Sequence, residues 1–174
     1  MKGVRARYLS LGAVGVVAVW VSATADIGPR IVYNASPSLP TGYYWITPTT
    51  EIQRGHLVLV PVPSAYRSLV EKRRYLGPNV PLIKPVAALE GDHVCIRNGA
   101  VSINGKVVGH TLKSDSKGRV LNAWKGCQPL TEGEFFALIA GVRESLDSRY
   151  FGPLRVRSVI GRAWPLWVNS GGER

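Results

Sequence analysis

The chain contains few of the residues from which metal sites are built. Its 174 residues include two cysteines and three histidines, His56, His93 and His110. The histidines are scattered without the spacing of metal ligands, and no Cys-x-x-Cys pair occurs. Structural zinc sites use closely spaced ligands of these types. The sequence therefore argues against a metal site.

Acidic residues are also scarce. Eleven Asp and Glu residues stand against 22 Lys and Arg residues, which gives a formal net charge of +11. This charge suits nucleic acid or an anionic membrane surface as a partner. Neither a DNA-reading motif nor a long basic block is present, so we favour the membrane and expect no nucleic-acid partner. A nucleic-acid binder and a basic surface without a dedicated partner are the alternatives.

A long apolar run lies near the N-terminus. Basic residues within residues 1–7 precede a run over residues 8–25 that is interrupted only by small polar residues. Its length fits either a signal segment or a short transmembrane anchor, which needs about 17–25 residues. In both cases residues 1–7 form a basic cytoplasmic region and residues 26–174 an exported domain. A buried cytosolic helix is disfavoured because the polar face that it needs is missing.

Two cysteines suit an exported domain. Cys95 and Cys127 fit a single disulfide, which an oxidising compartment would preserve. Cys95 lies in an apolar run and Cys127 at the end of the polar, turn-rich stretch over residues 110–129. A bridge between them would tie that stretch to a sheet. Two unpaired buried thiols are the alternative.

Turn residues dominate the fold prediction. Twelve prolines and nineteen glycines indicate many turns and short strands, not a helical bundle. Asn-Gly pairs at residues 98–99 and 104–105 separate short apolar runs and predict a β-meander. Only residues 64–76 of the exported part show helical character, with Ser64 as the N-cap. Other strands are expected at residues 42–46, 56–62, 80–89 and 134–140, with a final strand pair over residues 156–168.

The expected fold class is mainly β. It consists of an antiparallel β-sheet domain with one short helix, and an N-terminal hydrophobic helix precedes this domain. The expected localisation is the inner membrane with the domain in the periplasm, or the periplasm after cleavage of the N-terminal segment.

A serine and a lysine carry the chemistry that the sequence suggests. Ser38 lies in a proline-interrupted turn, Ser-Pro-Ser-Leu-Pro-Thr-Gly at residues 36–42. A serine hydroxyl is a poor nucleophile and needs a neighbouring base. Lys84 lies in an apolar run, and burial there would favour its neutral form. Together they suggest a serine–lysine peptidase; the alternatives are ordinary turn chemistry for the serine and an exposed lysine on a half-buried strand.

Four stretches, in this order, resemble the sequence boxes of type I signal peptidases. Residues 36–40 resemble the nucleophile box, and residues 83–92, Ile-Lys-Pro-Val-Ala-Ala-Leu-Glu-Gly-Asp, resemble the lysine box. Residues 145–152, Ser-Leu-Asp-Ser-Arg-Tyr-Phe-Gly, and residues 159–163, Val-Ile-Gly-Arg-Ala, resemble the two C-terminal boxes. The resemblance implies a signal-peptidase-like antiparallel β-sheet domain and a membrane-associated serine endopeptidase that processes an exported precursor.

Two further stretches, residues 34–44 and 124–127, are similar to the conjugative-transfer branch of this family, the TraF-type peptidases. That branch processes the precursor of a conjugative pilin, and in some systems it also joins the pilin ends into a ring. The resemblance thus implies a pilin precursor and the conjugative transfer machinery as partners, and it leaves cyclisation open. A general signal peptidase for secretory preproteins and a non-catalytic envelope assembly factor are the alternatives.

The resemblance also assigns roles to individual residues. Ser38 matches the nucleophile and Lys84 the general base. Ser36 matches the serine whose hydroxyl joins the backbone N–H of Ser38 in the oxyanion hole, and Ser145 matches the serine that orients the lysine. The mechanism needs no cofactor and no histidine, so a Ser-His-Asp hydrolase is a poor interpretation.

Asp147 and Arg149 match a structural acid–base pair that supports the loop around Ser145. Two residues apart on an extended segment, they would share a face. A carboxylate beside an arginine stays ionised and is a weak base, which favours support over catalysis. Residues 140–143, Ala-Gly-Val-Arg, depart from the Gly-Asp-Asn sequence usual before this box, and Pro85 replaces the arginine that often follows the base.

Overall fold

The structure, a computed structural model, describes residues 14–17, 20 and 30–169. One sheet contains β1 (Ile31–Asn34), β2 (Gly42–Thr47), β3 (Leu57–Val60), β4 (Leu82–Leu89), β9 (Glu134–Ala137), β10 (Leu154–Arg155) and β11 (Gly161–Val168). The other contains β5 (His93–Arg97), β6 (Ala100–Ile103), β7 (Lys106–His110) and β8 (Cys127–Pro129). The helices of the sheet domain are α2 (Ser64–Lys72), α3 (Ser148–Phe151) and the 3-10 helix η1 (Val156–Ser158).

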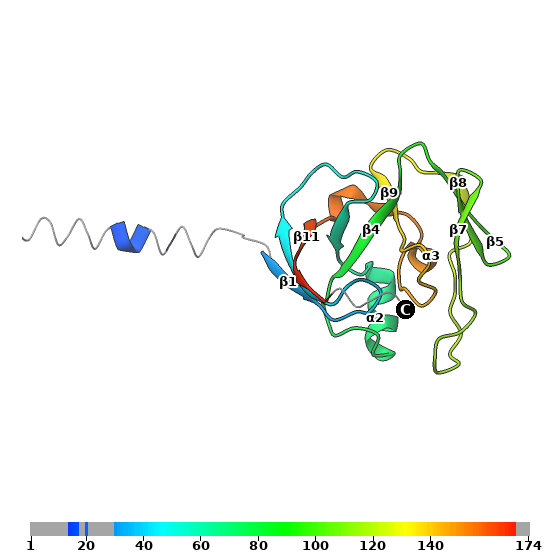
Figure 1. The fold of residues 1–174 in the computed structure, drawn as a ribbon, viewed down its shortest axis with the longest axis horizontal. Helices are drawn as coiled ribbons and strands as arrows, with labels where there is room; N and C mark the ends of the chain where they lie inside the picture. Colours follow the sequence, from blue (N-terminus) through cyan, green and yellow to red (C-terminus); the bar gives the residue numbers. More distant parts are fainter. Residues whose placement is uncertain (1–13, 18–19, 21–29, 170–174) are drawn as a thin grey trace, which may run out of the picture.

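The strand order is β1-β2-β11-β3-β4-β9-β10 in the seven-stranded sheet and β7-β6-β5-β8 in the four-stranded sheet. Every pair of strands in these two sheets is antiparallel. In Figure 1, β1 and β11 lie on one side of the domain and β5, β7 and β8 on the other, with β4 and β9 between them. The mainly β, antiparallel fold expected from the sequence is confirmed.

The meander of the smaller sheet follows from its two Asn-Gly turns. Asn98 and Gly99 have φ angles of 50° and 81°, and Asn104 and Gly105 have φ angles of 50° and 80°. A type I′ turn needs positive φ at both central residues, and Asn-Gly is the dipeptide best suited to it. The predicted meander is confirmed.

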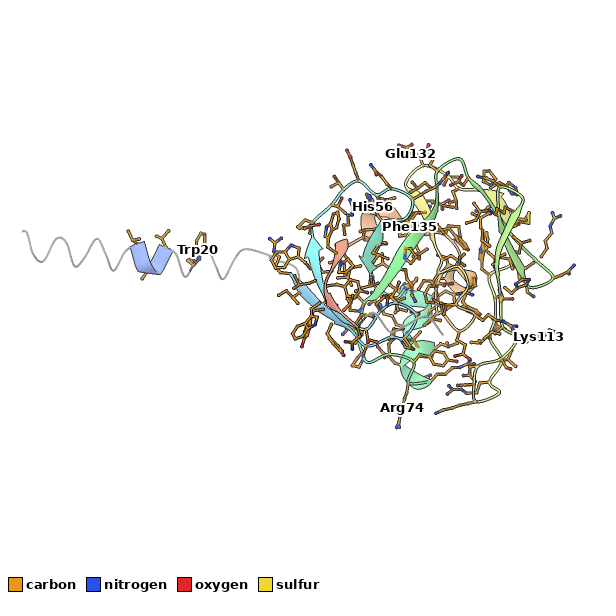
Figure 2. The ribbon with its side chains drawn as sticks, viewed as in Figure 1. Trp20, His56, Arg74, Lys113, Glu132 and Phe135 are labelled. Atoms are coloured by element: carbon orange, nitrogen blue, oxygen red, sulfur yellow. A yellow bond between two sulfur atoms is a disulfide. The ribbon has the colours of Figure 1, made fainter. Side chains whose placement is uncertain are left out.

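Adjacent residues of β9 point into different parts of the core. Phe135 and Phe136 are both fully buried. Phe135 packs in a cluster with Val58 and Val70, whereas Phe136 packs with Val94 and Val101 of the smaller sheet. Successive side chains of a strand point to opposite faces, so β9 joins the two cores. Figure 2 shows Phe135 inside the domain and Arg74, Lys113 and Glu132 at its periphery.

Helix α2 is shorter than the sequence pattern suggested. It ends at Lys72, and Arg74 adopts a left-handed φ of 56°, which turns the chain out of the helix. The N-cap is Pro63, without a side-chain capping hydrogen bond, so the expected capping by Ser64 is wrong.

The expected strand pair over residues 156–168 is also wrong. Residues 156–158 form η1, and only β11 follows it. β11 pairs instead with β2 and β3, far from it in sequence.

The predicted N-terminal regions, residues 1–7 and 8–25, lie largely outside the described residues. Of residues 8–25 the structure describes residues 14–17 and 20, which are helical and exposed. No helix within the described residues has both the length and the apolar character needed to cross a bilayer.

In the smaller sheet, a disulfide links Cys95 in β5 to Cys127 in the neighbouring strand β8, and the two residues are directly opposite each other. The two cysteines are 32 residues apart in sequence. Closing a loop of that length restricts the unfolded chain and adds about 3–4 kcal/mol to the free energy of unfolding in the chain-entropy model.

We therefore expect the double variant Cys95→Ser/Cys127→Ser to lose about 3–4 kcal/mol in free energy of unfolding, measured by urea titration. Wild-type protein treated with a reductant is the control and should match the variant. Equal stability of the oxidised wild type and the variant would contradict this expectation.

Candidate active site

Ser36 and Ser38 lie in the connection between β1 and β2. Their hydroxyl oxygens are 2.9 Å apart, and the backbone N–H of Ser38 donates to the hydroxyl oxygen of Ser36 over 3.5 Å. Both residues are partly buried. The turn thus brings two hydroxyls and one backbone donor to the same place.

Lys84 lies in β4, opposite Val58 of β3. Its side chain is buried, with the residue only 3% exposed. Its Nζ donates to Ser38 Oγ over 2.9 Å and to Ser145 Oγ over 2.8 Å. The fold therefore brings together three polar side chains from a turn, a strand and a loop that are far apart in sequence.

Burial changes the protonation of this lysine. The apolar surroundings disfavour the ammonium form and lower the pKa of Lys84 to about 8, while the charge of Asp147 opposes this shift and that of Arg149 adds to it. An amine with this pKa is half neutral at a pH of about 8. Lys84 can then accept a proton from a neighbouring hydroxyl, which a free lysine rarely does near neutral pH.

The loop that carries Ser145 is fixed by a buried ion pair. Asp147 and Arg149 are each 1% exposed, and Arg149 donates to both carboxylate oxygens of Asp147, over 2.9 and 2.8 Å. Arg149 also donates to the carbonyl of Val142 over 2.6 Å and to that of His110 over 3.1 Å. A buried pair with its hydrogen bonds satisfied rigidifies its surroundings.

The expected extended conformation of this segment is wrong. Asp147 is extended, but it is the N-cap of α3, and its side chain accepts the backbone N–H of Arg149 over 3.1 Å. Ser148, fully buried, accepts the backbone N–H of Ala137 in β9 over 3.0 Å. Sequence reasoning missed both the short helix and the role of Ser148 in attaching it to the sheet.

A cavity of about 230 Å³ opens beside these groups. Ser36, Lys84 and Ser145 line it together with apolar side chains, among them Tyr75 and Leu76. The sequence pattern predicts a helix over residues 64–76. The structure shows that the chain reaches the cavity only after α2 has ended.

Two distant segments are joined at the wall of this cavity. The hydroxyl of Tyr75 donates to Asp115 Oδ2 over 2.5 Å, and Arg119 Nε donates to the same oxygen over 2.6 Å. Arg73 donates to the carbonyl of Val120 over 2.9 Å. Burial raises the pKa of Asp115, but the hydrogen bonds that it accepts from Tyr75, Arg119 and Lys117 outweigh burial, and the net shift is downward. No sequence signal links Tyr75 with Asp115, because 40 residues separate them.

The site is built from hydroxyl and amine groups. Within the described part of the chain, no group of three or more His, Cys, Asp or Glu side chains is arranged to hold a metal ion. What the arrangement can do chemically is transfer a proton from Ser38 to Lys84 and leave the serine oxygen free to attack a carbonyl carbon.

The chain matches one protein-family model and is similar to several known proteins. The model of the family described as "Signal peptidase, peptidase S26" matches residues 5–167. The chain is 33% identical over 167 residues to the conjugal transfer protein TraF of Agrobacterium fabrum (strain C58), covering 91% of this chain and 93% of the relative. It is 26% identical over 163 residues to the plasmid transfer protein TraF of Escherichia coli, covering 88% and 90%.

Among solved structures, the chain resembles a signal peptidase I from Enterococcus faecalis V583. The sequence identity is 25% and the TM-score is 0.40, over 64% of this chain and 96% of the other.

The lowered pKa of Lys84 predicts a pH dependence of the free energy of unfolding, which can be measured without a substrate. Because the folded state binds this proton less tightly than the unfolded chain, the unfolded state carries more protons between a pH of about 8 and a pH of about 10.4. The free energy of unfolding should therefore rise by about 3 kcal/mol as the pH increases across this window.

Lys84→Met is the control, because it lacks the titrating group and retains a chain of similar length. Urea titrations at several pH values should show the wild type gaining stability relative to this variant as the pH rises. Parallel stability curves for the two proteins would contradict a lysine that is buried and neutral in the fold.

Proposed function

The chain belongs to the signal peptidase family, peptidase S26, in the branch of the TraF-type conjugative-transfer proteins, and on that premise we propose that it is a serine endopeptidase with a Ser38–Lys84 dyad. The family implies a serine peptidase that works at the membrane or in the periplasm. The observation that carries the residue assignment is the buried Nζ of Lys84 within hydrogen-bond distance of both Ser38 and Ser145.

The proposed reaction begins with neutral Lys84. As Ser38 Oγ attacks the carbonyl carbon of the scissile peptide bond, Lys84 Nζ takes the hydroxyl proton. The tetrahedral intermediate collapses to an acyl-enzyme, and the ammonium of Lys84 gives that proton to the departing amine. Water, activated by the again neutral Lys84, then hydrolyses the ester and releases the acid product and the Ser38 hydroxyl.

Ser145 and Ser36 have supporting roles in this proposal. Ser145 accepts a hydrogen bond from Lys84 and so holds its nitrogen toward Ser38. The hydroxyl of Ser36 and the backbone N–H of Ser38 would together stabilise the oxyanion. Removing one such donor costs about 2.7–4 kcal/mol in transition-state stabilisation. The ion pair of Asp147 and Arg149 supports the loop of Ser145.

The proposed substrate is an exported precursor protein, most of all the precursor of a conjugative pilin. The support is that several relatives are named as conjugal or plasmid transfer proteins. Joining of the pilin ends would need the acyl-enzyme to be attacked by an amine of the same pilin in place of water.

A surface of exposed aromatic residues supports association with the membrane. Tyr43 and Trp45 in β2 lie opposite Trp167 and Trp164 in β11, and all four are at least 41% exposed. Trp and Tyr side chains are enriched at membrane–water interfaces. In the sequence, the apolar run at residues 8–25 ends a few residues before β1, the edge strand that pairs with β2. We propose that residues 26–174 are exported and stay at the inner membrane, or are released when the run is cleaved.

A general signal peptidase for secretory preproteins is the second candidate, because the matching family model is that of signal peptidases. A panel that contains a conjugative pilin precursor and unrelated secretory preproteins separates the two. Selective cleavage of the pilin precursor favours the first function, and comparable cleavage of all preproteins favours the second.

The central test is replacement of the two dyad residues. We expect Ser38→Ala to abolish processing of the precursor and Lys84→Ala to lower turnover by at least about 100-fold, the lower limit of what a general base contributes. The double variant should lose no more than Ser38→Ala alone, because the two groups act as a unit. Product masses report cleavage and the scissile bond.

Ser158→Ala and Lys106→Ala serve as matched controls, since neither residue lines the cavity. Lys106 is exposed, and the half-buried Ser158 donates its hydroxyl only to the carbonyl of Arg155. Both controls should process the precursor at the wild-type rate. Substantial processing by a folded Ser38→Ala protein would overturn the dyad.

A further inference from the structure

The side-chain amide of Asn34 spans the turn that carries Ser36 and Ser38. Asn34 is the last residue of β1. Its Nδ2 donates to the carbonyl of Ser36 over 3.0 Å, to that of Leu39 over 3.3 Å and to that of Pro40 over 3.2 Å. Its Oδ1 accepts the backbone N–H of Ser36 over 3.1 Å. One amide thus contacts the backbone on both sides of Ser38.

The turn has few other means of holding its shape. Pro37 and Pro40 have no backbone N–H to donate. Residues 35–40 make no backbone–backbone hydrogen bond with any residue that the structure describes. Besides Asn34, the buried Tyr44 donates its hydroxyl to the carbonyl of Pro40 over 2.8 Å. Asn34 thus supplies hydrogen-bond partners to four backbone groups of the turn, and Ser36 Oγ supplies one to the backbone N–H of Ser38.

We propose that Asn34 is a positioning residue that fixes the turn so that Ser36 and Ser38 face Lys84. This inference rests on the proposed peptidase function. Asn34 makes no hydrogen bond to Lys84 or to the hydroxyl of Ser38 and acts only through the backbone. The serine oxygen must lie within about 3 Å of its base, and a misplacement of about 1 Å can cost 100-fold in rate.

Asparagine is the residue type that this position requires. An amide combines two N–H donors and a carbonyl acceptor on a short side chain. An aspartate of the same shape keeps the acceptor for the N–H of Ser36 but would present an oxygen to the three carbonyls. An alanine removes the contacts altogether. Asn34→Asp therefore tests the loss of the N–H donors alone, and Asn34→Ala tests the loss of all side-chain hydrogen bonds.

Asn104→Asp is the matched control. Asn104 also uses both ends of its amide, since Nδ2 donates to Asp92 over 2.8 Å and Oδ1 accepts the backbone N–H of His93 over 2.8 Å. It lies in the turn between β6 and β7, in the smaller sheet, and contributes nothing to the cavity. It reports the effect of losing a structural asparagine away from the dyad.

The first measurement is the cleavage of the precursor that the wild type processes in a Ser38-dependent way. We expect Asn34→Asp and Asn34→Ala to lower kcat by about 100-fold with little change in KM. The pH of half-maximal turnover should stay the same in Asn34→Ala, because Asn34 does not contact Lys84. Asn104→Asp should retain the wild-type kcat below its unfolding temperature. A wild-type kcat in both Asn34 variants would overturn the inference.

The second measurement is amide hydrogen exchange, read by mass spectrometry on peptides that cover residues 34–42. Exchange should accelerate there in Asn34→Ala and remain unchanged in Asn104→Asp, with the other peptides of the sheet domain protected as in the wild type. If the wild type shows no Ser38-dependent cleavage, the peptidase function fails, and exchange alone decides the role of Asn34. If residues 34–42 exchange in Asn34→Ala at the same rate as in the wild type, the positioning role of Asn34 is overturned.

Discussion

The burial of one amine sets the requirements for the rest of the site. Lys84 is 3% exposed, and its pKa falls to about 8 because the ammonium form is poorly solvated there. A buried amine needs hydrogen-bond partners, and Ser38 and Ser145 supply them. β4 pairs with β3 on one side and β9 on the other, so Lys84 projects from an inner strand of the seven-stranded sheet.

Ser145 and Ser38, the two hydrogen-bond partners of Lys84, are each held in place by a different set of contacts. The Ser145 loop depends on the buried Asp147–Arg149 pair, and α3 is attached to β9 through Ser148. The Ser38 turn has no such ion pair and depends on the amide of Asn34 and the hydroxyl of Tyr44. These contacts fix the loop and the turn against β4, which is the preorganisation that the proposed proton transfer between side chains requires.

Strong local signals and family motifs make the β-meander and the residues of the candidate site predictable from the sequence. The Asn-Gly turns determine their own backbone conformation, so the meander follows from four residues. Four motifs in order, which include those around Ser38 and Lys84, indicate the family from the sequence alone. The end of α2 was not predictable, because residues 73–76 contain no helix breaker and are held instead by distant groups such as Asp115 and Val120. The helical turn α3 is likewise too short to show a periodicity.

The pH dependence of turnover tests the central claim most directly, because burial lowers the pKa of the proposed base to about 8, between the ordinary values of histidine and lysine. With saturating precursor, kcat of the wild type should rise with pH and reach half its maximum at a pH of about 8, and the rise should persist when His56 and His93 are replaced. A flat profile, or a limb in the histidine range that disappears with His56 or His93, would contradict general-base catalysis by Lys84.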